Sequence, residues 1–99
     1  MYREITLQDF QQDLHLMKSF TPDGIKAVFD ILQLEEKELG YEYKFDPVWI
    51  SCSFALYKES ELLGEYGVDN IDQMADYQLW EVAPNLQRME TEKSYILRL

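Results

Sequence analysis

The side chains that could do chemistry in this chain are mostly carboxylates. The segment ESELLGEYGVDNIDQMAD, residues 59–76, contains no lysine or arginine, and its acidic residues are Glu59, Glu61, Glu65, Asp69, Asp72 and Asp76. From Glu61 onward they follow at intervals of 4, 4, 3 and 4 residues, a spacing that puts neighbours ~5–6 Å apart on one helix face. Gly64 and Gly67 make one unbroken helix unfavourable, so we expect the row to bend.

Such a row suits one of two roles. Phosphates along a nucleic-acid strand have a spacing of the same order, so unpaired carboxylates at this pitch could occupy a channel built for nucleic acid. Tyr66 and Tyr77 lie beside the row and are candidate anchors, because tyrosine is amphipathic and rigid. The alternative is a solvated surface that serves only solubility.

A second acidic group is the weaker candidate for partner binding, because Lys37 and Lys44 dilute it. Its members are Glu35, Glu36, Glu38, Glu42 and Asp46. The aromatic residues Tyr41, Tyr43 and Phe45 alternate with charged residues in the same region. They could line a contact surface, but covering one edge of the core is the favoured interpretation.

The residue types that catalysis and metal binding need are few. His15 is the only histidine, so no histidine pair exists, and we expect it on a helix surface. Cys52 is the only cysteine, which excludes an internal disulfide, and its apolar neighbours predict a core thiol. No phosphate-binding loop, dinucleotide fingerprint or nucleophile elbow is present. The sequence therefore predicts no catalytic residues, no metal and no cofactor.

Charge restricts the partners. The chain has 19 acidic and 9 basic residues, which gives a formal net charge of −10. It should repel nucleic acid and anionic membranes, because binding to either rests on lysine and arginine. We therefore expect any partner to present a basic surface.

The 99 residues suit one domain, residues 1–99. No segment approaches the ~20 apolar residues that span a bilayer, and the N-terminal residues lack the apolar core of a signal peptide. Together with the single cysteine, these features predict a cytoplasmic protein.

Apolar periodicity predicts two N-terminal helices. The first follows Thr6, with its apolar face at Leu7, Phe10, Leu14 and Met17. The second is capped by Thr21, has Pro22 in its first turn and stops at Gly40.

Three strands are predicted, at about 47–55, 78–83 and 93–99. The first rests on the alternation of Val48, Ile50, Cys52 and Phe54. Two short helices, 59–66 and 70–76, precede the second strand. Because strands and helices do not alternate regularly, the expected class is α+β, a small antiparallel sheet with helices on one face. The last strand could lie at an edge and pair with a second copy, but the net charge favours a monomer.

One further pattern joins these segments. The order FTPDGIKAVFDILQLEEKELGYEYKFDPVWISCSF, ESELLGEYG, YQLWEV and SYILRL resembles a family of small acidic proteins from phages and mobile elements, over residues 20–99. The chain departs from that pattern at Ser51-Cys52, where a pair of cysteines is common. The resemblance supplies no catalytic residues. It implies an inhibitor of a bacterial defence system, such as an anti-CRISPR protein, whose partner would be a nucleic-acid-binding protein of that system.

Two other functions stay open. An immunity protein or antitoxin that neutralises a basic nuclease or toxin would need the same acidic face on a small scaffold. An acidic structural protein would have no basic partner at all.

Overall fold

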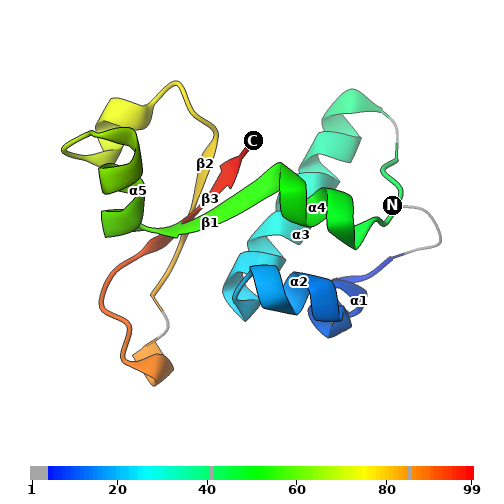
Figure 1. Cartoon of the computed structure of the whole chain (residues 1–99). Coiled ribbons are helices and arrows are strands. Elements are labelled where there is room, and N and C mark those ends of the chain that lie inside the picture. Colours follow the sequence, from blue (N-terminus) through cyan, green and yellow to red (C-terminus); the bar gives the residue numbers. More distant parts are fainter. Residues whose placement is uncertain (1–4, 41, 85) are drawn as a thin grey trace.

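The computed structural model describes residues 5–40, 42–84 and 86–99 and confirms an α+β fold. Four α-helices come first, α1 (Leu7–Gln12), α2 (Leu14–Ser19), α3 (Pro22–Leu39) and α4 (Pro47–Ser53). Strand β1 (Phe54–Lys58) follows, then helix α5 (Glu59–Tyr66) and the 3-10 helix η2 (Ile71–Met74). Strand β2 (Leu79–Val82), the short turn η3 (Leu86–Arg88) and strand β3 (Ser94–Arg98) complete the fold (Figure 1).

The first predicted helix is divided at Asp13. The Thr6 hydroxyl and the Asp9 carboxylate cap each other's backbone N–H groups, which starts α1 as expected. The Asp13 carboxylate then accepts the N–H of Leu16 at 3.0 Å and begins α2 in a new direction. The predicted apolar face is therefore wrong beyond Phe10. Leu14 and Met17 are 72% and 53% exposed, and Leu16 enters the core instead.

Helix α3 follows its sequence signals. The Thr21 hydroxyl accepts the N–H of Gly24 at 3.1 Å, and Pro22 occupies the first turn. Gly40 ends the helix with a φ of 75°, a left-handed conformation that glycine adopts without steric cost.

The strand predicted at 47–55 is wrong over most of its length, because residues 47–53 form α4. The Asp46 carboxylate caps the N–H of Trp49 at 3.2 Å, and Pro47 takes the first helical position. On this helix Ile50 is buried, whereas Cys52 is exposed, so the predicted core thiol is also wrong. The chain becomes extended only at Phe54, where β1 begins.

The sheet is antiparallel, with strand order β1-β3-β2. The register aligns Leu56, Ile96 and Trp80 across the three strands. The last strand is thus central, and the prediction that it forms a sheet edge is wrong. Edge pairing through β3 is excluded as a route to a dimer, while a monomer remains our expectation.

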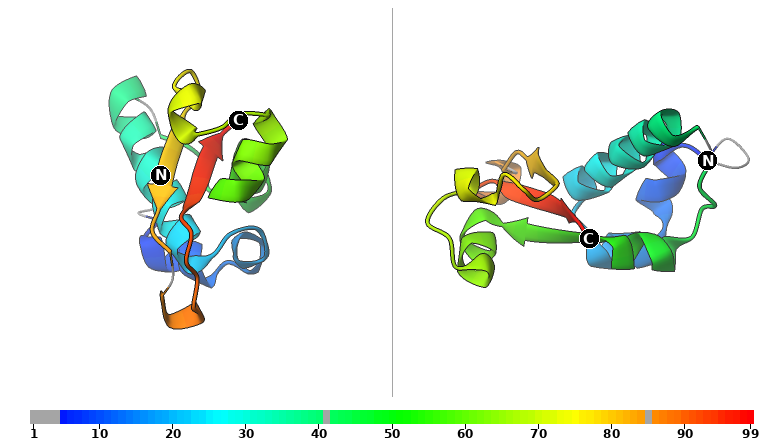
Figure 2. Two further views of the ribbon diagram at one scale, coloured as in Figure 1. Left: turned by 90° about the vertical axis from the view of Figure 1, so that its left-hand side faces the viewer. Right: turned by 90° about the horizontal axis from the view of Figure 1, so that it is seen from above.

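Helices cover both faces of the sheet, not one as predicted (Figure 2). Phe54, Leu56 and Ile96 face the main core formed with α1 to α4. On the other face Tyr95 packs with Leu62 of α5 and Met74 of η2, in what we call the second cluster. The predicted helix 70–76 is present in shortened form as η2. Within the described ranges, no helix has the length and apolarity needed to cross a membrane.

Candidate partner-binding site

The carboxylates of residues 59–76 lie on α5, on η2, on the turn between them and, for Asp76, just after η2. Gly67 ends α5 with a φ of 63°, so the row bends where the sequence predicts. Asn70 then caps η2 by accepting the N–H of Gln73 at 3.2 Å. Leu62 and Met74 are both buried in the second cluster, which fixes the two short helices against the sheet. The acidic side chains are therefore carried on an ordered scaffold rather than on one straight helix face.

Five of these carboxylates, all but Glu59, are exposed. Four of the five form a set of their own: Glu65, Asp69, Asp72 and Asp76. None of them makes a hydrogen bond or an ion pair with another described residue through its side chain. We call these four residues the free acidic group. Because residues 59–76 contain no lysine or arginine, these four carboxylates make this part of the surface negative.

Glu59 and Glu61 differ from the free acidic group. The Glu61 carboxylate accepts the backbone N–H of Lys58 at 2.9 Å and so caps the start of α5. Glu59 is half-buried and lies near Lys93. The hydrogen bond and the charge of Glu81 raise the pKa of the Lys93 ammonium above its ordinary value, and Glu59 adds to this shift. Glu61 therefore serves the fold, whichever partner the protein binds.

The two candidate anchors, Tyr66 and Tyr77, contact each other edge to face, with ring centroids 5.0 Å apart. Tyr66 is half-buried in the second cluster, and burial raises the pKa of its hydroxyl, with smaller contributions from Tyr57, Tyr77 and Glu65. Tyr77 is 48% exposed. Tyr66 thus supports Tyr77, which is the side chain of the pair that offers area to a partner.

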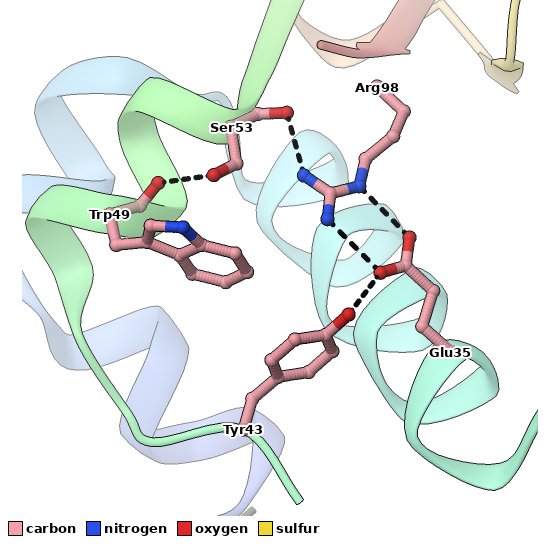
Figure 3. Close-up of polar contacts among 5 residues, drawn as sticks. All are labelled: Glu35, Tyr43, Trp49, Ser53 and Arg98. Atoms are coloured by element: carbon pink, nitrogen blue, oxygen red, sulfur yellow. Dashed lines mark hydrogen bonds and ion pairs between the residues drawn. The ribbon is translucent and has the colours of Figure 1, made fainter. Parts of the chain in front are cut away.

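In the second acidic group, Glu35 is held in a hydrogen-bond network within the fold (Figure 3). The Glu35 carboxylate receives hydrogen bonds from Arg98 Nε at 3.0 Å, from Arg98 Nη2 at 3.2 Å and from the Tyr43 hydroxyl at 2.7 Å. Arg98 Nη1 also donates to the Ser53 carbonyl at 3.2 Å, and the guanidinium lies over the rings of Trp49 and Phe54. Glu35 and Arg98 are only 19% and 18% exposed. This network joins β3 to α3 and α4.

The other members of this group divide in the same way. Glu36 accepts the N–H of Tyr43 at 2.7 Å, and Asp46 caps α4. Glu38 and Glu42 are exposed. Glu35, Glu36 and Asp46 thus already have hydrogen-bond partners within the fold, and the prediction that they bind a second protein stays a prediction. Sequence reasoning missed Arg98 as the partner of Glu35, and the available signal was one arginine in an otherwise uncharged last strand.

The remaining candidate side chains are placed as follows. His15 is exposed, as expected, with its Nε2 atom 2.8 Å from the Ser51 hydroxyl. Tyr43 and Phe45 are half-buried against the main core, which confirms the core-covering interpretation, and Tyr41 lies outside the described residues. Among the residues with described positions, no group of three histidine, cysteine, aspartate or glutamate side chains could hold a metal ion.

Comparison with protein-family models, with curated proteins and with solved structures finds no match to this chain. The side chains described above and the sequence pattern are therefore the basis for any proposal about its function.

Proposed function

We propose that this protein is a non-catalytic inhibitor that acts in the cytoplasm by placing its free acidic group on a basic, nucleic-acid-binding surface of a partner protein. The observation that carries the proposal is that four exposed carboxylates without partners follow one another within residues 59–76, a segment with no lysine or arginine. Folding makes use of Glu35, Glu36 and Glu61 through hydrogen bonds. It makes no such use of the free acidic group, which leaves that group for intermolecular contacts.

The mechanism is competition for lysine and arginine side chains. Carboxylates held on α5 and η2 would take the places of phosphates, and the exposed ring of Tyr77 would add apolar contact area. The second cluster holds the segment in place before binding, so little ordering entropy is lost on association. Because exposed charges are screened beyond ~8 Å at physiological ionic strength, binding should weaken steeply as salt is added.

The resemblance to small acidic phage proteins favours a bacterial defence protein, such as a CRISPR–Cas effector, as the partner. An immunity protein would bind a basic nuclease or toxin through the same surface. The identity of the captured partner distinguishes these two settings.

The test starts with capture. The protein is immobilised, exposed to lysate from a bacterium that carries CRISPR–Cas and nuclease-toxin genes, and eluted with increasing salt. We expect a nucleic-acid-binding protein with a basic surface, whose binding to nucleic acid is blocked by the inhibitor. Recovery of no basic protein would favour the acidic structural alternative and would contradict the proposal.

Two matched variants then assign the surface. The first neutralises the free acidic group through Glu65→Gln, Asp69→Asn, Asp72→Asn and Asp76→Asn. The second removes the same amount of charge elsewhere through Asp13→Asn, Glu38→Gln, Glu42→Gln and Asp46→Asn, since Asp13 and Asp46 are N-caps, where asparagine serves about as well as aspartate, and Glu38 and Glu42 are exposed. We expect the first variant to lose inhibition and the second to keep it. Equal inhibition by both would refute the assignment.

A further inference from the structure

Strand β2 has one side without a partner. It pairs only with β3 among the described residues, and it runs along the side of the sheet away from α5 (Figure 2). The Gln78 carbonyl accepts the N–H of Arg98 at 3.0 Å, which makes Gln78 and Arg98 a hydrogen-bonded pair. Bonded and non-bonded pairs alternate in an antiparallel ladder, so the backbone N–H and C=O groups of Leu79 and Glu81 point away from β3.

The other edge strand, β1, has fewer backbone groups free to pair with another strand. Helix α4 leads directly into β1, and α5 begins directly after it. The outward N–H of Lys58 is already taken by the Glu61 carboxylate. In the described part of the chain, no corresponding bond is made by the outward groups of Leu79 and Glu81. An unpaired strand edge is a template for another extended segment.

The space beside β2 is a groove between this strand and α3. One hollow, of about 650 Å³, lies between the C-terminal half of α3, Trp80 and the end of β3. Leu34 and Leu99, at its rim, are 48% and 65% exposed. A second hollow, of about 300 Å³, lies beside Glu81 and Val82 at the N-terminal half of α3. An incoming strand would therefore find apolar area on one of its faces.

The charges along this groove select its occupant. Among the described residues that line the groove, the basic ones are Lys26 and Arg98, and each is paired, Lys26 with Asp30 at 2.9 Å and Arg98 with Glu35. Asp23 at one end and Glu38 at the other make no ion pair with a described residue. A second copy of this chain would bring these acids together, on top of a net charge of −10 on each copy. The groove therefore suits a basic segment of another protein.

We infer that the open edge of β2 binds an extended segment of a partner protein as a fourth strand. The segment carries apolar side chains on the face that meets Leu34 and Trp80, and lysine or arginine at both ends, opposite Asp23 and Glu38. Backbone hydrogen bonds to Leu79 and Glu81 supply affinity, and the alternating side chains supply specificity. None of these residues belongs to the free acidic group, so this surface stands independently of the proposed inhibition.

The probe is a capped peptide of seven residues, Lys-Thr-Val-Thr-Val-Thr-Lys, in which both lysines and both valines lie on one face of the strand; it is titrated calorimetrically into the full chain. Three comparison peptides separate backbone pairing from charge and composition: one with alternate backbone amides N-methylated, one with glutamate in place of lysine, and one with the same composition in scrambled order. We expect the parent peptide to bind at least about tenfold more tightly than each of them, because each loses strand pairing, charge complementarity or alternation.

The matched protein variants are Glu81→Pro and Glu81→Ala. Both lose the ion pair with Lys93, but only proline removes the outward N–H and adds a ring where the partner strand would lie. We expect Glu81→Ala to bind the parent peptide almost like the wild-type protein, and Glu81→Pro to bind about tenfold more weakly. Should Glu81→Pro fail to fold, as judged by circular dichroism, the N-methylated peptide on the wild-type protein decides.

Three results would overturn the inference. The first is no binding of the parent peptide, and the second is equal binding of the parent and N-methylated peptides. The third is a dimer in light scattering that Glu81→Pro dissociates, because the occupant of the edge would then be a second copy. Failure here leaves the capture experiment on the free acidic group unaffected.

Discussion

Glu35 on α3 and Glu65 on α5 are both glutamates within Glu-rich helices, yet their surroundings are opposite. Glu35 is held by Arg98 and Tyr43 and is mostly shielded from water. Glu65 is exposed and makes no hydrogen bond or ion pair with a described residue. The difference arises because Arg98, 63 residues away in the sequence, extends from β3 to Glu35 on α3. Acidic residues in similar sequence surroundings therefore divide into those that stabilise the fold and those that are free, and the following predictions test that division.

The largest expected effect comes from breaking the contact between Arg98 and Glu35. Arg98→Met removes the cation but keeps an unbranched apolar side chain over Phe54, leaving the Glu35 carboxylate partly buried without its cation. We expect the free energy of unfolding to fall by about 2–3 kcal/mol. Urea titration followed by circular dichroism measures it. Glu65→Gln is the control, with an expected change below about 0.5 kcal/mol. A small effect of Arg98→Met would mean that the network adds little net stability.

A smaller effect is expected at the tyrosine of the same network. Tyr43→Phe removes only the hydroxyl that donates to Glu35 at 2.7 Å and leaves the ring beside Trp49. We expect a loss of about 1 kcal/mol in the free energy of unfolding. Tyr77→Phe should change this quantity very little, because the Tyr77 hydroxyl has no hydrogen-bond partner among the described residues. Equal losses would mean that the distinction between the two tyrosines is wrong.

The two glutamates of α5 permit a finer comparison. Glu61→Ala removes the cap on the Lys58 N–H, whereas Glu65→Ala on the same helix removes no hydrogen bond. We expect Glu61→Ala to cost about 0.5–1 kcal/mol, because water can partly replace the lost acceptor at this exposed site. Thermal unfolding of the two variants, measured side by side, provides the comparison. If Glu65→Ala proved the more destabilising of the two, Glu65 could not belong to a free group.

The last prediction concerns alkaline pH. Burial raises the pKa of both Tyr66 and Tyr95, and the nearby acids Glu59 and Glu81 raise that of Tyr95 further. The folded protein therefore favours the protonated phenols. Their contribution to stability is complete below the pKa of a tyrosine in the unfolded chain, near 10. It is lost as the pH rises through the higher pKa values of Tyr66 and Tyr95 in the folded protein.

Unfolding free energies measured from about pH 9 to about pH 11 test this prediction. The wild-type protein should lose stability over this range. Tyr66→Phe and Tyr95→Phe should each lose less over the same interval, because phenylalanine has no proton to release. A loss unchanged in both variants would assign it to other groups, among them Lys93, whose pKa is also raised.

Local signals predicted the elements whose causes are local. Thr21 and Gly40 set the ends of α3, and Gly67 ends α5, because caps and left-handed glycines act over a single turn. Segment 47–53 was predicted as a strand although Asp46 and Pro47 carry equally local helix-start signals. A short apolar alternation fits either structure, and here the cap determined the result.

Long-range pairing explains what could not be predicted. The sequence identifies three strands but not that the last lies between the other two, because strand order depends on contacts such as that between Phe54 and Arg98. The same holds for the candidate site. The sequence correctly predicts Asp69, Asp72 and Asp76 as exposed acids, whereas the ion pair of Glu35 with Arg98 depends on where β3 lies and could not be predicted.

The central position of β3 also determines the order in which the protein can fold during synthesis. Helices α1, α2 and α3 form from local contacts, so they can assemble as soon as they leave the ribosome. Strands β1 and β2 have no strand to pair with until β3 has been made. Until then Phe54 and Leu56 also lack Ile96, against which they pack in the main core. A nascent chain halted before β3 would thus carry a formed helical half and two unpaired strands, the state in which aggregation is most favoured.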